Sequence, residues 1–75
     1  MMLAELNPAI REPGILVFDC PCGKCGGRIR VPLAPERDAR GQSWNHFGCV
    51  ERLTLSPSVD GGCWHGHIVQ GEITA

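Results

Sequence analysis

The sequence predicts a mostly β fold made of short antiparallel strands and hairpins. Ten glycines and six prolines interrupt the 75-residue chain every few positions, which leaves little room for helices. Short runs of β-branched and aromatic residues lie between these breaks, as strands require. Close pairs of cysteine and histidine stand beside two of the predicted turns, where side chains from distant parts of a chain often meet.

The length allows one domain only. Two Phe, two Trp and no Tyr are available to fill a core, so apolar burial alone gives marginal stability. Residues 15–75 are predicted to form the β domain, and residues 1–14 an N-terminal arm. Pro8 and Pro13 limit any helix in this arm, and a flexible tail is an equal alternative.

The first predicted hairpin joins residues 15–19 (ILVFD) and 28–33 (RIRVPL) across a Cys- and Gly-rich turn. The second run alternates apolar and basic residues, which is typical of a strand with one buried face. Residues 34–43 are polar and predict a loop, after which Trp44 and Phe47 are expected to return aromatic side chains to the core.

The second half of the chain predicts shorter elements. Residues 53–55 form a short strand that ends at Ser56-Pro57-Ser58, and Asp60-Gly61-Gly62 makes a turn. Residues 63–75 form a last hairpin with Gln70-Gly71 at its tip. Trp64 is expected to pack in the core or against the metal site described next.

Five cysteines carry the clearest chemical signal: Cys20, Cys22, Cys25, Cys49 and Cys63. Their odd number excludes a fully paired disulfide framework within one chain. The opening residues lack the pattern of a secretory signal, and no apolar run is long enough to cross a membrane. These features predict a cytoplasmic protein with reduced thiols, for which metal binding is the usual explanation.

A C-x-x-C pair followed by glycines, Cys22 to Gly27, is the arrangement of a zinc knuckle. Cys63 and His65 make the natural second pair, because period-two spacing places them on one face of a strand. Two hairpin turns facing one ion form a zinc-ribbon-like domain. The predicted ligands of one structural Zn²⁺ are therefore Cys22, Cys25, Cys63 and His65.

Two further residues are reserve ligands. The spacing leaves open whether Cys20 or Cys22 binds, or whether three thiolates join one histidine. His67 lies on the same predicted face as His65 and can replace it. Cys49 is expected to be a small buried hydrophobe, and His46 an exposed or locally hydrogen-bonded residue.

Four good ligands favour a closed metal site, so neither an enzyme nor a catalytic residue is predicted. A catalytic zinc keeps an open position for water, and Asp60 and His67 are the candidates to move protons beside one. Ser56, Ser58 and His65 are residue types of a serine hydrolase, but no G-x-S-x-G elbow supports that interpretation.

Several motifs together resemble a known family. They are FDCPCG at 18–23, SW at 43–44, LTLSPS at 53–58, CWHG at 63–66 and GEI at 71–73. In this order they resemble a family of small Cys/His proteins of zinc-binding type, found in bacteriophages and prophages, over about residues 15–74. The resemblance implies metal binding and a phage setting, without implying a reaction. Lys24 stands where a tighter C-G-C is expected, which keeps the choice between Cys20 and Cys22 open.

The predicted function is a small zinc-stabilised binding or adaptor module that acts through protein–protein interaction. In the phage setting it acts as an inhibitor of a host or defence factor, in the host cytoplasm, or as a small virion component; self-association is left open. A nucleic-acid-binding zinc module, using Lys24, Arg28, Arg30, Arg52 and Trp44, is an alternative that the net charge of −1 disfavours. A metalloenzyme with an open zinc site is the other alternative. No membrane partner is expected.

Overall fold

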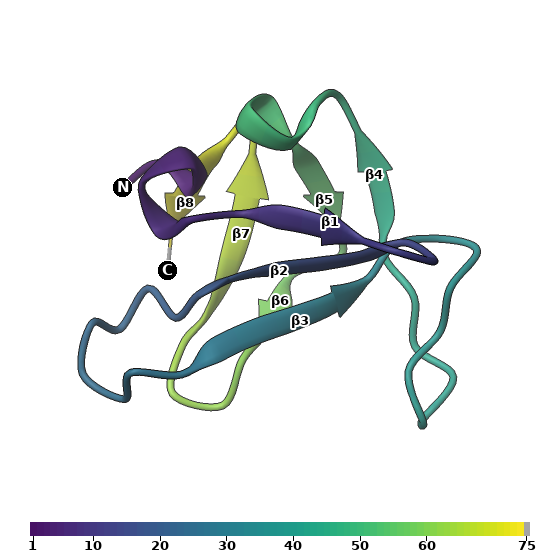
Figure 1. Cartoon of the computed structure of the whole chain (residues 1–75), viewed down its shortest axis with the longest axis horizontal. Helices are drawn as coiled ribbons and strands as arrows, with labels where there is room; N and C mark the ends of the chain where they lie inside the picture. The colour runs from purple at the N-terminus through teal and green to yellow at the C-terminus, as the bar shows by residue number, and fades with distance from the viewer. Residues whose placement is uncertain (75) are drawn as a thin grey trace.

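A computed structural model describes residues 1–74 of the chain. Eight short strands form three small antiparallel sheets, and two single-turn 3-10 helices complete the described elements (Figure 1). The elements in chain order are η1 (Leu3–Leu6), β1 (Ala9–Arg11), β2 (Ile15–Asp19), β3 (Arg28–Pro32), β4 (Asn45–Phe47), η2 (Val50–Arg52), β5 (Thr54–Ser56), β6 (Val59–Asp60), β7 (His65–Val69) and β8 (Glu72–Thr74). The predicted mostly β fold class is confirmed.

The first sheet has the order β1-β2-β3. Strands β2 and β3 pair from Ile15 opposite Pro32 to Asp19 opposite Arg28, so the predicted hairpin is confirmed. Alternation in β3 also holds, because Ile29 is buried while its neighbours Arg28 and Arg30 face solvent. An ion pair between Arg28 and Asp19, with 2.6 Å between Nη1 and Oδ1, closes the end of the hairpin that leads to the cysteines.

The second half of the chain forms a two-stranded sheet, β4-β5, and a three-stranded sheet, β6-β7-β8. The predicted last hairpin is confirmed, with Gln70 and Gly71 in left-handed conformations at its tip. In β7, Gly66 and Ile68 are buried while the residues between and beside them are exposed. A Cβ at Gly66 would collide with the Thr74 carbonyl oxygen of β8, so only glycine fits there.

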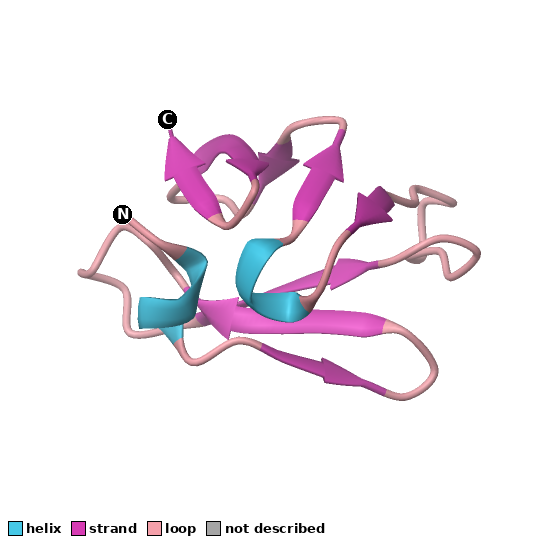
Figure 2. Cartoon of the chain, turned by 90° about the horizontal axis from the view of Figure 1, so that it is seen from above, coloured by secondary structure: helices cyan, strands magenta, loops and turns pink. Residues whose placement is uncertain are grey.

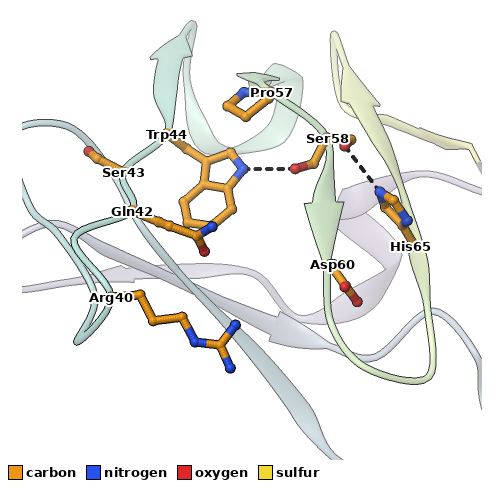
Figure 3. Close-up of a pocket in the computed structure, with 8 residues that line it drawn as sticks. All are labelled: Arg40, Gln42, Ser43, Trp44, Pro57, Ser58, Asp60 and His65. Atoms are coloured by element: carbon orange, nitrogen blue, oxygen red, sulfur yellow. Dashed lines mark hydrogen bonds between the residues drawn. The ribbon is translucent and has the colours of Figure 1, made fainter.

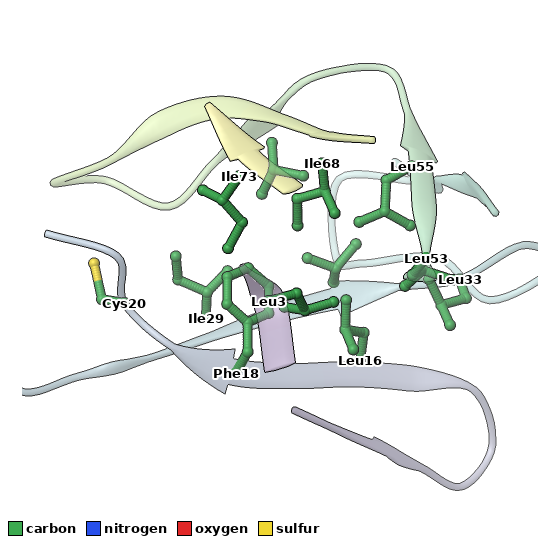
Figure 4. Packing of buried hydrophobic residues seen from close by; sticks show 12 residues of the cluster. Leu3, Leu16, Phe18, Cys20, Ile29, Leu33, Leu53, Leu55, Ile68 and Ile73 are labelled. Atoms are coloured by element: carbon green, nitrogen blue, oxygen red, sulfur yellow. The ribbon is translucent and has the colours of Figure 1, made fainter. Parts of the chain in front are cut away.

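The core lies between the β1-β2-β3 sheet and the strands of the second half (Figures 2 and 4). Phe18 and Leu16 of β2 meet Ile68 of β7 there, and all three are fully buried. Trp64 packs against this cluster edge-on to Phe18, with ring centroids 6.3 Å apart, which confirms its expected place in the core. The cluster is what holds the two turns that carry cysteine side by side.

The N-terminal segment contributes to this packing. Leu3 is fully buried, and its backbone N–H donates to the Gly71 carbonyl oxygen at 2.7 Å. Strand β1 pairs with β2 along its whole length. The proposed division at residue 14 stays a prediction, but the first fourteen residues include part of the core and of a sheet.

Two sequence expectations about side chains are wrong. Phe47 is 69% exposed because β4 presents it to solvent, whereas Trp44 packs against the core as expected. Cys49 is exposed, because it lies at the N-terminal end of η2 in an exposed stretch that follows the left-handed Gly48. No helix among residues 1–74 is long and apolar enough to cross a membrane.

Candidate functional site

Four cysteine sulfurs converge where two turns meet. The turn between β2 and β3 contributes three of them and the turn between β6 and β7 contributes the fourth; they are Cys20, Cys22, Cys25 and Cys63, with all Sγ atoms within 4.8 Å of one another. The Sγ of Cys63 lies 3.1 Å from that of Cys20 and 3.3 Å from that of Cys25. All are free thiols, so the group is a cluster of reduced sulfurs.

Backbone geometry prepares this turn for thiolates. The N–H groups of Lys24 and Cys25 both point at the Cys22 sulfur at 3.4 Å, and they lower the pKa of Cys22 to about 6. Gly23 and Gly26 adopt positive φ angles of 68° and 66°, which bend the chain tightly around the sulfurs. These contacts confirm the prediction that backbone N–H groups approach the sulfurs in the knuckle.

The residues fit a metal ion. Tetrahedral zinc with Zn–S bonds of about 2.3 Å separates its sulfurs by about 3.8 Å, and the nearest sulfurs here are 3.1 to 3.3 Å apart. An outward shift of a few tenths of an ångström at each thiol therefore makes room for the ion. Contact with the Cys20 thiol, and then with the other two, raises the pKa of Cys63 well above its ordinary value. A cation bound by the four sulfurs would take the place of the protons that these neighbouring thiols hold.

The predicted ligands and the four converging cysteines have three residues in common. Of the predicted ligands, Cys22, Cys25 and Cys63 are brought together, and the reserve residue Cys20 lies with them, 7% exposed. His65 is not in this group, and neither is the reserve His67. The assignment of ligands to an ion therefore stays a prediction, with Cys20 in the position that sequence spacing gave to His65.

His65 instead lines a pocket of about 320 Å³ (Figure 3). The residues lining the pocket are Arg40, Gln42, Ser43, Trp44, Pro57, Ser58, Asp60 and His65. The Oγ of Ser58 and the Nε2 of His65 lie 3.1 Å apart, within hydrogen-bond distance. A hydroxyl beside an imidazole nitrogen in a pocket is the pair required for nucleophilic catalysis.

Strand pairing brings these groups together. Ser58 immediately precedes β6 and His65 begins β7, and the turn between the two strands returns the chain so that Asp60 pairs with His65. The indole Nε1 of Trp44 donates to the Ser58 carbonyl oxygen at 3.1 Å, which ties the serine to the pocket wall. The N–H of Gly62 donates to Asp60 Oδ1 at 3.0 Å and fixes the carboxylate beside the turn.

Ser58 and His65 are residue types of a serine hydrolase, but no nucleophile elbow surrounds the serine, so the sequence did not predict them to be catalytic. The available signal was a different one. Ser58 and Asp60 precede a Gly-Gly turn and His65 follows it, so an antiparallel hairpin at this turn places all three on one side. His46 lies elsewhere, exposed and 3.3 Å from the Ala34 carbonyl oxygen, as expected of a local hydrogen-bonding residue.

Comparison with known proteins gives one finding. No curated protein and no solved structure matches this chain. A protein-family model described as "Bacterial ubiquitination-like system serine protease (BubE)" matches residues 4–75. The expectation that the chain is not an enzyme is therefore wrong, since this description names a protease, and the phage setting stays a prediction. Because the match covers nearly the whole sequence, the chain belongs to the BubE family.

Proposed function

We propose that this chain is a serine protease of a bacterial ubiquitination-like system, with Ser58 as nucleophile and His65 as general base. The contact of 3.1 Å between Ser58 Oγ and His65 Nε2 inside a pocket carries the proposal. A catalytic serine needs a base within about 2.6–3.2 Å. Among the serines that line the pocket, Ser43 lacks such a partner, since its buried Oγ has none among residues 1–74.

The reaction follows from the positions of these atoms. Ser58 Oγ attacks the carbonyl carbon of the scissile amide while its proton passes to His65 Nε2. His65 gives this proton to the leaving amine as the C–N bond breaks, which leaves an acyl ester on Ser58. Water then attacks the ester, its proton moves to His65, and the acid product departs as the proton returns to Ser58.

Asp60 is the orienting group in this proposal. It lies directly opposite His65 across the β6–β7 ladder, where the Cβ atoms of paired residues are about 4.5–5.5 Å apart. Its Oδ1 accepts from Gly62, which holds the carboxylate on the side of the sheet that bears His65. No ion pair between Asp60 and His65 is present among residues 1–74. The proposal therefore requires the carboxylate to rotate towards the imidazole, where it would stabilise the imidazolium formed during attack.

The four thiols hold a structural Zn²⁺ in this proposal. Four sulfur ligands close the coordination sphere, so the metal supplies folding energy and leaves the hydrolysis to the pocket. Zinc is favoured because thiolates arranged around a tetrahedral centre select zinc or iron–sulfur, and a closed set of four cysteines is a common zinc site. The metalloenzyme alternative, which requires an open coordination position, is not favoured by this geometry.

The predicted binding of a protein partner becomes binding of a substrate in this proposal, because a protease in such a system must bind a protein as its substrate. The nucleic-acid alternative has less support. Arg28, part of the basic surface it requires, is paired with Asp19, and Trp44 lies in the pocket wall. We therefore propose a protein substrate.

A fluorophosphonate probe tests the proposed function, because it reacts covalently with an activated serine. Labelling of the wild-type protein at Ser58, mapped by mass spectrometry, is the expected result, with loss of labelling in Ser58→Ala. Ser56→Ala is the matched control, since Ser56 is an exposed serine two positions away without a histidine partner among residues 1–74. Equal labelling of wild type and Ser58→Ala would contradict the proposal.

A further inference from the structure

One cation lines the pocket without a partner. Arg40 stands on the loop between β3 and β4, and Figure 3 shows its guanidinium group pointing into the space below Trp44. Arg28 and Asp19 form the one ion pair among residues 1–74, and no side-chain hydrogen bond of Arg40 occurs there either. Its charge is therefore available to a molecule that enters the pocket.

The loop that carries Arg40 is internally braced. Asp38 Oδ1 accepts from the backbone N–H groups of Arg40 at 2.8 Å and Gln42 at 2.9 Å. The Arg37 guanidinium donates to the Gly41 carbonyl oxygen at 2.7 Å across the same turn. These bonds use the side chains of Arg37 and Asp38 to fix the turn and leave the side chain of Arg40 directed at the pocket.

The other charged groups of the pocket do not neutralise Arg40. Asp60 is the pocket's carboxylate, and its Oδ1 is held by the Gly62 N–H at the start of its own turn. The Nε2 of His65 lies within hydrogen-bond distance of the Ser58 hydroxyl. The guanidinium group is thus an unpaired cation in the same pocket as the Ser58–His65 pair, and its planar fork matches a carboxylate in a bidentate contact.

We propose that Arg40 sets the substrate preference of this site by binding a carboxylate that lies close to the scissile bond. The inference rests on the proposed function, since it names what the Ser58–His65 pair acts on. Two sources supply a carboxylate to a protease pocket. One is an Asp or Glu side chain of the substrate, and the other is the free C-terminus of the substrate chain.

Cleavage of a proteome-derived peptide library, read by mass spectrometry, tests the inference. The wild-type protein is expected to enrich Asp or Glu at one position near the cleavage site, or to cut near free C-termini. A second library with amidated C-termini separates the two sources, because only terminal recognition is lost there. Arg40→Ala is expected to reduce kcat/KM for the preferred peptides about tenfold, and Arg40→Glu to shift the preference towards Lys and Arg.

Controls keep the two proposals apart. Arg11→Ala removes another exposed arginine, on β1 and outside the pocket, and is expected to leave the preference unchanged. Cleavage without acidic or terminal preference, or a preference that survives Arg40→Glu, would overturn the role of Arg40 while leaving the protease intact. No cleavage above the level of Ser58→Ala would overturn the proposed function, and the inference with it.

Discussion

The two ends of the β6–β7 hairpin differ in how their chemistry is built. At its turn, Cys63 meets three cysteines of a distant turn, and the group depends on the packing of two halves of the chain. At its start, Ser58 and His65 meet through the pairing of one hairpin. In the proposed function the first region stabilises the fold and the second carries out the reaction, so variants of the two regions should lose different properties.

The largest effect is expected from loss of the proposed zinc ion. Chelation, or Cys20→Ser, should remove the ion and unfold the chain, because apparent binding energies of structural zinc in small domains are about 10–16 kcal/mol. Circular dichroism and elemental analysis measure both losses. Cys49→Ser, which removes an exposed cysteine outside the cluster, should retain one ion per chain. A folded Cys20→Ser variant with full metal would restore His65 as the candidate fourth ligand.

Replacing His65 distinguishes the role of the Ser58–His65 pair from that of the four-cysteine cluster most directly. His65→Ala should lower kcat by about 10²–10⁴, the usual contribution of a general base, and leave metal content and thermal stability unchanged. His67→Ala, on the same exposed face of β7, is the matched control and should keep full activity. Loss of metal in His65→Ala alone would show that the histidine belongs to the thiol cluster.

Asp60→Asn tests the proposed role of Asp60 in orienting His65. Asparagine can still accept from the Gly62 N–H but cannot stabilise an imidazolium. The fold should be retained, and kcat should fall by at most about 10⁴-fold, the effect of the same change in a Ser-His-Asp triad. Steady-state kinetics and a thermal melt measure the two quantities. Glu72→Gln removes an exposed carboxylate of β8 and should change neither. Unchanged kcat in Asp60→Asn would leave His65 without an orienting group in the proposed mechanism.

The smallest effect is expected at the pocket wall. Trp44→Phe keeps an aromatic ring but removes the Nε1 donor to the Ser58 carbonyl oxygen. One such hydrogen bond contributes about 1 kcal/mol, so a few degrees in Tm and a few-fold decrease in kcat are expected. Phe47→Leu, an exposed change in the adjacent strand, is the control. A wild-type kcat in Trp44→Phe would exclude this tether from the catalytic geometry.

Local patterns predicted the longer strands. The β-forming run of β2, the alternation of β3 and the last hairpin were all recognised from sequence. Strands β1, β4 and β6 have only two or three residues each, and they exist because a partner strand is present. Their pairing is a tertiary property that no window of sequence contains.

The candidate site divides in the same way. Spacing alone predicted that Cys22, Cys25 and Cys63 lie close together, which the structure shows; their binding of an ion stays a prediction. The preference for His65 over Cys20 followed from treating Cys63 and His65 as one ligating pair, but His65 turns towards Ser58 because both flank the same turn. The exposure of Phe47 could not be predicted either, because aromatic character does not reveal that all three residues of β4 are exposed.

The short β6–β7 hairpin carries both halves of this chemistry. Asp60, Cys63 and His65 all lie on it, and Cys63 is exposed although it belongs to the cluster. An electrophile that reacts with this thiol acts two residues from His65, the proposed general base, and does not need to enter the pocket. The hairpin therefore offers a route to inactivators that displace the proposed ion and destabilise the fold without competing for the substrate pocket.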